Sequence, residues 1–336
     1  MARKFGVYDG RFKVEKKGMH LYLPLLRQPT GKEMKTLEQT LQDIEICVHD
    51  FHEMVTKPQS FVDLLAVELP PHLVASLPRS ADFIGDISIV EISKELGAYK
   101  NRIGEAILKT NKHIRTVLAK ASAVNGVYRT RKFEVIAGEP KTVTAHKENG
   151  CIFHVDVSKA YFSPRLSTEH ARIAKLVSKG EIVIDMFAGV GPFSVQIAKR
   201  YDNVRVYAVD VNPDAIEFLN KNIAANKVLA NVTPVLGDVR VVVHKRLAGI
   251  ADRVIMNLPE RAIEYVDVAC EALKPSGGIM HYYAFTEASE SISAVEVRLI
   301  EAVKKAHRKV EKILTSKMVR ATAPYTWQVV VDAKIR

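Results

Sequence analysis

Apolar runs of strand length alternate with stretches of helical spacing through residues 159–336. We expect strands at residues 181–187, 204–210, 232–237, 252–257 and 277–285, with helices between them. This alternation predicts an α/β domain with a doubly wound sheet of five parallel strands. A helix expected at residues 287–307 is followed by two further strand-like runs, 310–320 and 325–335. Only residues 321–324 join these runs, which leaves no room for a crossover helix, so the pair must be antiparallel.

The preceding part of the chain has shorter elements and predicts two smaller α+β modules. The expected elements are strands at residues 12–14 and 20–25, a helix at 32–43, a strand at 45–49, a strand at 84–92, a helix at 94–110, strands at 116–120 and 133–137, and a hairpin turn at 146–150. Prolines in Lys57-Pro58 and Pro70-Pro71 interrupt the connection between the two modules. We therefore expect three domains, at residues 1–57, 58–158 and 159–336.

Charge and cysteine content narrow the class of protein. The 49 basic residues exceed the 38 acidic ones by 11, which favours a polyanionic partner over a generic basic surface. Cys47, Cys151 and Cys270 are far apart and form no C-x-x-C pair, which indicates a reducing compartment and no structural zinc. Residues 1–10 are not followed by a signal-peptide core, and no apolar run reaches about 18 residues. We expect a cytoplasmic protein that does not cross a membrane.

Residues 182–194 combine a buried strand, a glycine turn and a helix start. Gly189 and Gly191 allow the backbone to approach a ligand without interference from a Cβ atom. A dinucleotide fingerprint would have a third glycine where this chain has Ser194, and the closing Gly-Lys-Ser/Thr of a phosphate loop is also absent. The D-x-F-x-G-x-G-P-F pattern resembles instead the first motif of S-adenosylmethionine-dependent methyltransferases, which also close five parallel strands with an antiparallel hairpin.

Polar residues end the following strands as well. Ligands of open α/β sheets bind beyond the carboxyl ends of the strands. Asp210 at the second strand could accept ribose hydroxyls, and Asp238 at the third could accept an adenine amino group. Either aspartate alone could be a helix N-cap. Together with Asp185 and the glycine turn, however, they favour a nucleoside ligand.

Further motifs carry a closer resemblance. They are His146-Lys147-Glu148-Asn149-Gly150, Tyr161-Phe162-Ser163-Pro164-Arg165, Glu169-x-x-Arg172-Ile173, the glycine turn and Met256-Asn257-Leu258-Pro259. Together they resemble the archaeal and eukaryotic tRNA (guanosine-37) N1-methyltransferase family, strongly over residues 125–336 and more loosely around Lys57-Pro58 and residues 90–93. The resemblance implies a Rossmann-like seven-stranded catalytic domain, a middle RNA-binding domain and a small N-terminal domain that contacts the outer corner of tRNA. This chain enters the N-terminal domain at its strand portion, so we expect that domain to be shortened.

The family's reaction explains the residue types. Guanine N1 carries a proton at neutral pH, so its methylation needs a base and a donor that stabilises charge on O6. The resemblance implies that Glu169 is the base, that Arg129 stabilises O6 and that Asn257 orients the guanine edge. It also implies substrate contacts by Tyr161, Arg165, Arg131 and Pro259, and S-adenosylmethionine contacts by Asp185, Phe187, Gly189, Gly191, Asp210, Val211, Asp238, Val239 and Asn257. The expected partner is the anticodon region of tRNA, bound by a monomer that needs no metal.

Plainer interpretations stand beside these roles. Glu169 could support a helix start after Thr168, Tyr161 could be a packing residue, and the tract from Tyr128 to Lys132 could be a solvated basic face. An alternative enzyme is the related transferase that moves the 3-amino-3-carboxypropyl group of the same cofactor onto a tricyclic tRNA base. The Asn257-Leu258-Pro259 loop favours methyl transfer, because the aminocarboxypropyl family lacks it. A non-catalytic RNA-binding relative is a third possibility, against which Asp185, Glu169 and Asn257 count.

Overall fold

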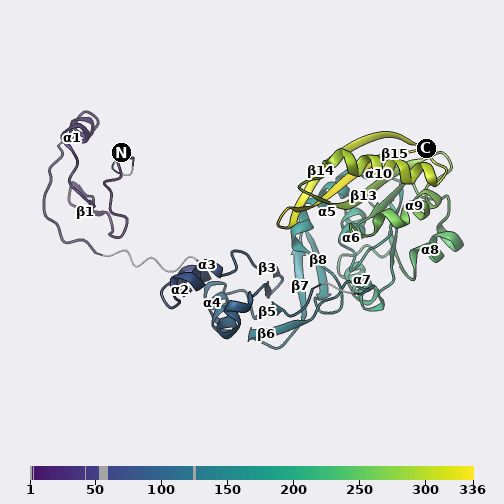
Figure 1. The fold of residues 1–336 in the computed structure, drawn as a ribbon, viewed down its shortest axis with the longest axis horizontal. Helices are drawn as coiled ribbons and strands as arrows, with labels where there is room; N and C mark the ends of the chain where they lie inside the picture. The colour runs from purple at the N-terminus through teal and green to yellow at the C-terminus, as the bar shows by residue number, and fades with distance from the viewer. Residues whose placement is uncertain (1, 3, 42, 53–59, 124–125) are drawn as a thin grey trace. The chain divides into compact units, whose positions relative to one another are not determined.

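The computed structural model describes all residues except 1, 3, 42, 53–59 and 124–125. Its chain divides into two compact units, Met1–Asp63 and Leu64–Arg336 (Figure 1). The boundary expected near residue 57 lies outside the described residues, and the division into three domains stays a prediction. No helix in the described part of the chain is long and apolar enough to span a bilayer.

The second unit contains the predicted seven-stranded sheet, in the order β11-β10-β9-β12-β13-β15-β14. Its strands are β9 (Ile182–Asp185), β10 (Arg205–Asp210), β11 (Val232–Leu236), β12 (Arg253–Met256), β13 (Gly278–Glu287), β14 (Val310–Ala323) and β15 (Thr326–Ile335). Strands β9 to β13 are parallel to one another, and β15 lies antiparallel between β13 and β14. The Rossmann-like sheet expected from the sequence is therefore confirmed.

Both faces of this sheet are covered by helices. Val183 and its neighbour Ile184 are completely buried, but they belong to two different hydrophobic clusters because successive strand residues point to opposite faces. One face packs against α5 (Ser167–Leu176), α6 (Pro192–Arg200) and α7 (Pro213–Ala225); the other packs against α8 (Val239–Val242), α9 (Val266–Ala272) and α10 (Ile292–Lys305). Short irregular helices join them: η2 (Pro164–Leu166), η3 (Val243–Leu247) and η4 (Ala262–Tyr265). Burial on both sides explains why these strands are continuous apolar runs.

The connection from β9 to α6 needs glycine for a steric reason. Gly191 has a φ of +87°, and a Cβ atom there would lie 2.3 Å from Leu219 Cδ1. Pro192 follows as the first residue of α6, where its missing N–H leaves no unpaired donor. The chain therefore turns sharply at the end of β9, and α6 starts directly beside the carboxyl edge of the sheet.

The remaining elements of the second unit build a smaller sheet and a hairpin. The sheet has the order β3-β4-β5-β6, from β3 (Asp82–Ile84), β4 (Ile87–Val90), β5 (Thr116–Lys120) and β6 (Phe133–Gly138); the hairpin joins β7 (Val143–Glu148) and β8 (Cys151–Asp156). Helices α3 (Pro71–Ser76), η1 (Lys94–Tyr99) and α4 (Lys100–Thr110) accompany them, and α2 (Phe61–Ala66) includes the boundary between the two units. Asn149 and Gly150 form the predicted hairpin turn, both with positive φ.

One strand prediction in this region is wrong. The run 84–92 was expected to be a single strand, but the chain reverses at Gly85, so that β3 and β4 pair antiparallel. Gly85 has a φ of +57°, and a Cβ atom there would lie 2.1 Å from Thr144 Oγ1. The reversal therefore depends on a glycine whose role is visible only when the β7 strand packs against it.

The first unit is small. It contains β1 (Glu15–Lys17), β2 (His20–Tyr22) and α1 (Gly31–Glu38), whose N-terminus has a capping box between Thr30 and Glu33. The first strand lies later than the expected 12–14. The strand expected at residues 45–49 is wrong, because those residues have no regular secondary structure.

Candidate active site

A cavity of about 210 Å³ lies at the carboxyl ends of the central strands. Most of its wall comes from six segments, residues 126–129, 161–163, 186–189, 210–212, 237–239 and 257–261. Four of these segments directly follow β9, β10, β11 and β12. This is the edge at which open α/β sheets bind ligands.

The cavity brings together many of the predicted site residues, but not all. Its wall includes the predicted cofactor contacts Phe187, Gly189, Asp210, Val211, Asp238, Val239 and Asn257, the predicted O6 stabiliser Arg129, and the predicted substrate contacts Tyr161 and Pro259. Within the described part of the chain, the wall does not include Glu169, Asp185, Gly191, Arg131 or Arg165. Most of the predicted cofactor contacts thus share one cavity with the predicted guanine contacts, whereas the predicted base is not part of its wall.

Asp185 ends β9 as a completely buried carboxyl group. Its Oδ2 accepts a hydrogen bond from Ser194 Oγ at 2.7 Å, and its Oδ1 has no hydrogen-bond partner among the described residues. Burial, together with the nearby Asp210, raises the pKa of Asp185 to about 7. An unpaired buried acceptor of this kind is the feature that a cationic ligand group would satisfy.

Backbone N–H groups hold the side chain of Asp210, which does not cap a helix. Its Oδ2 accepts the N–H of Gly189 at 2.7 Å, and its Oδ1 accepts the N–H of Asn212 at 2.9 Å. Asn212, not Asp210, is the N-cap of α7, since its side chain accepts the N–H of Asp214. Burial raises the pKa of Asp210. Two backbone donors therefore fix this carboxylate against the glycine turn on the cavity wall.

Asp238 is a helix N-cap, which is the plainer interpretation of an aspartate at the end of a strand. Its side chain accepts the N–H of Arg240 and caps the short helix α8. Beside it the cavity has an aromatic wall, in which the rings of Phe187 and Tyr265 meet edge to face at 5.1 Å and Arg240 covers the Tyr265 ring. A flat apolar surface next to a polar strand end suits an adenine ring.

These features fit S-adenosylmethionine. Asp210 would hold the ribose hydroxyls, Phe187 and Tyr265 would border the adenine, and the unpaired Oδ1 of Asp185 has the charge needed beside an ammonium group. The cofactor supplies a methyl group activated by a sulfonium, so the protein itself needs no group to activate the donor.

Arg129, Tyr161 and Glu260 also belong to the cavity wall. The guanidinium of Arg129 forms a bidentate ion pair with the Glu260 carboxylate, at 2.5 and 2.9 Å, and lies 5.9 Å from the centre of the Tyr161 ring. Arg129 has a positive φ of 54°, and its side chain is 20% exposed while that of Glu260 is 51% exposed. A cation, an aromatic face and a carboxylate are thus grouped on one part of the cavity wall.

Two residues that sequence analysis missed organise this wall. Arg320 on β14 donates to Tyr161 Oη at 2.9 Å, to Ser163 Oγ at 2.7 Å and to Gln328 Oε1 at 2.9 Å. Gln328 on β15 in turn donates to Asn257 Oδ1 at 3.0 Å. With its oxygen occupied, Asn257 presents its amide N–H groups to the remaining surroundings. Arg320 and Gln328 therefore set the orientation of both Tyr161 and Asn257.

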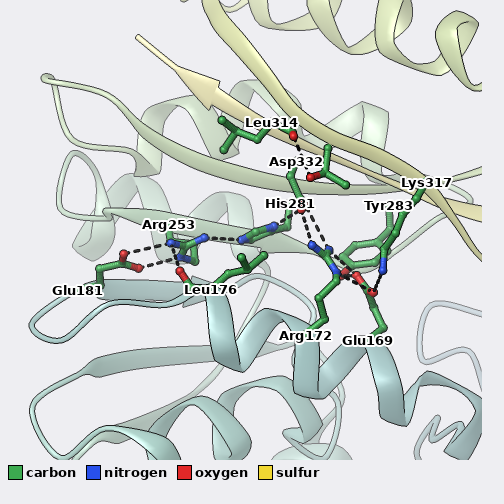
Figure 2. A network of polar contacts seen from close by, with 11 residues as sticks. Glu169, Arg172, Leu176, Glu181, Arg253, His281, Tyr283, Leu314, Lys317 and Asp332 are labelled. Atoms are coloured by element: carbon green, nitrogen blue, oxygen red, sulfur yellow. Dashed lines mark hydrogen bonds and ion pairs between the residues drawn. The ribbon is translucent and has the colours of Figure 1, made fainter.

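Glu169 lies in a buried ionic network that Figure 2 shows from close by. Its Oε1 accepts from Arg172 Nη2 at 2.6 Å and from Tyr283 Oη at 2.7 Å, and its Oε2 lies 3.2 Å from Lys317 Nζ. Burial alone would raise the pKa of Glu169, but these three partners outweigh it and hold the pKa below its usual value. Glu169 is therefore ionised at neutral pH, which is the state that a base requires.

The network continues across the sheet in Figure 2. Arg172 also pairs with Asp332, which accepts from His281 Nδ1 at 2.6 Å. Arg253 Nη1 lies 2.7 Å from His281 Nε2, and because an arginine can only donate, His281 Nε2 must be the acceptor. His281 is therefore neutral with its proton on Nδ1, in agreement with a pKa that burial lowers.

The two predicted phosphate contacts lie outside the cavity wall. Arg165 Nε pairs with Asp82 at 2.5 Å, and its side chain is about half exposed. Arg131 follows Arg129 by two residues and is half-buried. Both cations lie near residues of the wall in sequence, and their role stays a prediction.

A family model described as the TRM5/TYW2 methyltransferase domain matches residues 144–313, and one described as the TYW2 N-terminal domain matches residues 61–142. The tRNA (guanine(37)-N(1))-methyltransferase Trm5b of Pyrococcus abyssi is 38% identical over 332 residues, which cover 99% of this chain and 93% of that protein.

Solved structures agree over the full length. The crystal structure of wild-type Trm5b from Pyrococcus abyssi superposes with a TM-score of 0.81 at 36% identity, covering 99% of this chain and 94% of that one. A second structure, a complex of aTrm5 and tRNALeu, has a TM-score of 0.75 at 34% identity and covers 100% of this chain and 95% of that one. Fold and sequence therefore point to the same group of enzymes.

Proposed function

This chain belongs to the TRM5/TYW2 methyltransferase family, and we propose that it transfers a methyl group from S-adenosylmethionine to N1 of guanosine 37 in tRNA. The observation that carries the proposal is that the wall of one cavity contains both Gly189 and Asp210, on the cofactor side, and Arg129 and Asn257, on the side of the base. In addition, the tRNA (guanine(37)-N(1))-methyltransferase Trm5b of Pyrococcus abyssi is similar to this chain over 99% of its length.

Arg129 and Asn257 match the hydrogen-bonding edge of guanine. When N1 loses its proton, negative charge gathers on O6, and a guanidinium stabilises that charge. Asn257 has its oxygen held by Gln328, so its N–H groups are available to an acceptor on the base. Tyr161 supplies an aromatic face, 38% exposed, on which the base or its neighbour would stack.

Glu169 is the proposed base, and its geometry sets a condition on when it acts. Lys317 Nζ lies 3.2 Å from Oε2, and Arg172 donates to both carboxylate oxygens. Lys317 is 38% exposed on the edge strand β14, where an RNA phosphate can compete for its ammonium group. Arg172 Nε also donates to Oε2, at 2.9 Å, so loss of the Lys317 contact would leave Oε2 with a single donor. The pKa of Glu169 would then rise, and RNA binding would activate the base.

The partner is an RNA. A net charge of +11 favours binding to a polyanion, and the solved complex of aTrm5 with tRNALeu covers this chain completely. The anticodon region, the monomeric state and contacts by Arg131 and Arg165 belong to the proposal. Binding to tRNA should weaken steeply with added salt, because basic side chains release counterions from phosphates.

Incubation with tRNA transcripts that carry guanosine or adenosine at position 37 tests the function. Digestion and mass spectrometry should find 1-methylguanosine at position 37 of the first transcript and no methyl group at that position of the second. Methylation at another nucleotide, or no transfer to tRNA that binds, would refute the proposal.

A second candidate reaction has one observation in its favour. Residues 61–142 match a model described as a TYW2 N-terminal domain, and transfer of the 3-amino-3-carboxypropyl group is the alternative that sequence analysis left open. The same digestion separates the two reactions when a tRNA with a tricyclic base at position 37 is added to the two transcripts, because the aminocarboxypropyl product requires that base and is heavier than the methyl product. A non-catalytic RNA-binding relative would bind tRNA and leave its mass unchanged.

A further inference from the structure

Gln328 is a buried glutamine whose two amide ends have different partners. It lies on β15, is 1% exposed and belongs to the cavity wall. Its Oε1 accepts from Arg320 Nε at 2.9 Å, and its Nε2 donates to Asn257 Oδ1 at 3.0 Å. Rotating the amide by 180° would break both bonds, because N–H groups would then face the guanidinium and the two amide oxygens would face each other.

Arg320 fixes the direction of this chain of hydrogen bonds. It lies directly opposite Gln328 in the β14–β15 pair, next to a register shift in β14. Its guanidinium also donates to Ser163 Oγ at 2.7 Å and to Tyr161 Oη at 2.9 Å, so three acceptors hold it in place. An arginine can only donate, so the amide oxygen of Gln328 must face it. The amide nitrogen of Gln328 is therefore the end that meets Asn257.

The resulting orientation of Asn257 matters because purines differ at the atom bonded to C6. Guanine has an oxygen there, which accepts hydrogen bonds, whereas adenine has an amino group, which donates them. With its oxygen used by Gln328, Asn257 offers a ligand only its N–H groups. Asn257 and Arg129 belong to the same cavity wall, and guanine O6 has two lone pairs, so it can accept from both.

We propose that Gln328 and Arg320 are positioning residues that make the site select guanine over adenine, because they hold Asn257 as a hydrogen-bond donor to O6. The inference rests on the proposed function, since it concerns base selection at the same site. An adenine in the site would place its amino group against the N–H groups of Asn257, and two donors that face each other both lack an acceptor. Base selection then depends on Arg320, which lies on the edge strand β14.

Reversing the amide of Asn257 tests the assignment. In Gln328→Glu, one carboxylate oxygen can still accept from Arg320, and the other faces Asn257 as an acceptor. Asn257 must then turn its N–H groups toward the carboxylate and its oxygen toward the base. The single-turnover rate of methylation at guanosine 37 should fall roughly ten- to hundredfold, the range for a polar group that loses its partner.

The relative affinity of two tRNA transcripts shows whether base preference changes. The transcripts differ only at position 37, which is guanosine in one and adenosine in the other, so effects of the variant on the rest of the RNA cancel in the ratio. Binding to the full chain is measured by fluorescence anisotropy with S-adenosylhomocysteine present. The wild type should prefer the guanosine transcript, and Gln328→Glu should shift the ratio by about tenfold or more toward adenosine.

Two further variants separate base selection from packing. Gln328→Met keeps the size of the side chain but no longer fixes Asn257, so its ratio should lie between those of the wild type and Gln328→Glu. Thr286→Val is the matched control. Thr286 is a buried polar residue of the neighbouring strand β13, donates to the carbonyl of Glu290 and is not in the described cavity wall. This variant should keep the wild-type ratio.

The possible results are distinct. An unchanged ratio in both Gln328 variants, or an equal loss of affinity for both transcripts, would overturn the inference and leave Gln328 as a packing residue. If Gln328→Glu does not fold, Gln328→Met decides by the same ratio. A wild type that prefers the guanosine transcript but does not methylate N1 of guanosine 37 would overturn the proposed function alone. A wild type that methylates guanosine 37 but binds both transcripts equally would overturn the inference alone.

Discussion

Arg129 and Glu260 form a bidentate ion pair across the side of the cavity that faces the proposed guanine site, at 2.5 and 2.9 Å. The pair has two consequences. It lowers the pKa of Glu260, so the carboxylate remains charged, and it occupies the guanidinium that is proposed to stabilise guanine O6. A base that enters the cavity must therefore compete with Glu260 for Arg129.

Removing this competition should strengthen RNA binding. We expect Glu260→Gln to lower the dissociation constant for guanosine-37 tRNA by about two- to fivefold, the range for an exposed ion pair, as measured by fluorescence anisotropy. Glu217→Gln controls for the charge change, because Glu217 forms an exposed ion pair with Lys221 on α7. An equal gain in both variants would mean that Arg129 is not restrained by Glu260.

The carboxyl edge of the sheet could be predicted from the sequence because it depends on local signals. Each of these signals lies within a few residues of the structural feature that it predicts. They are the glycine turn, the strand-end residues Asp210 and Asn257, and the two C-terminal strands that follow each other closely. The resemblance placed Arg129 and Tyr161 beside them, although they lie in earlier segments of the chain.

Other parts could not be predicted because they depend on residues that meet only in the fold. Glu169 is covered by Lys317 and linked through Arg172 to Asp332, which lies 160 residues after Arg172. The i,i+3 spacing of Glu169 and Arg172 on α5 is a local sign of that pair, but nothing local indicates the contacts with Lys317 and Tyr283. Gln328 could have been singled out, because a glutamine inside the apolar run of β15 needs a partner when buried.

Cofactor binding should depend on pH through Asp185. Its pKa is raised to about 7 by burial, so the carboxyl is largely protonated below that pH in the free protein. An ammonium group beside it favours the ionised form, so binding must release the proton, and affinity should rise by up to about tenfold per pH unit toward pH 7 and then level off. Calorimetry between pH 5 and 8 checks this. The dependence of affinity on pH should disappear in Asp185→Asn, and also when the ligand is 5′-methylthioadenosine, which lacks the ammonium group. If it persists in both experiments, the proton belongs to another group.

Stability at low pH should depend on Asp332. Burial alone would raise its pKa, but His281 and Arg172 outweigh it and lower the pKa to about 2, from an ordinary value of 3.8. The unfolded chain therefore binds this proton more readily, so the stabilisation is complete above about pH 4 and is lost as the pH falls toward 2. Asp332→Asn leaves Arg172 with only part of its charge compensation and should lower the free energy of unfolding by about 3–5 kcal/mol at neutral pH.

Urea unfolding of both proteins across the acidic range measures that difference. The gap between wild type and Asp332→Asn should narrow as the pH falls below about 4, because the wild-type carboxylate then loses its charge. A constant gap down to pH 2 would show that Asp332 acts through packing rather than through its charge.

Glu169→Gln tests the proposed base. The variant keeps the size of the side chain and should bind cofactor and tRNA normally, but single-turnover methylation should slow on the order of 10²- to 10⁴-fold. Higher pH should recover part of the rate, since guanine N1 then ionises without a base. Arg129→Ala should lose rate without this recovery, because charge still gathers on O6. Full activity in Glu169→Gln would eliminate Glu169 as the base.

Transfer of an isotopically labelled methyl group from S-adenosylmethionine to a guanosine-37 transcript tests the central claim most directly. After nuclease digestion, mass spectrometry should place the label on N1 of guanosine 37, and the transfer should not occur with adenosine at that position. A product that carries an aminocarboxypropyl group, a label on another nucleotide, or an unmodified transcript that nevertheless binds the protein would contradict the account.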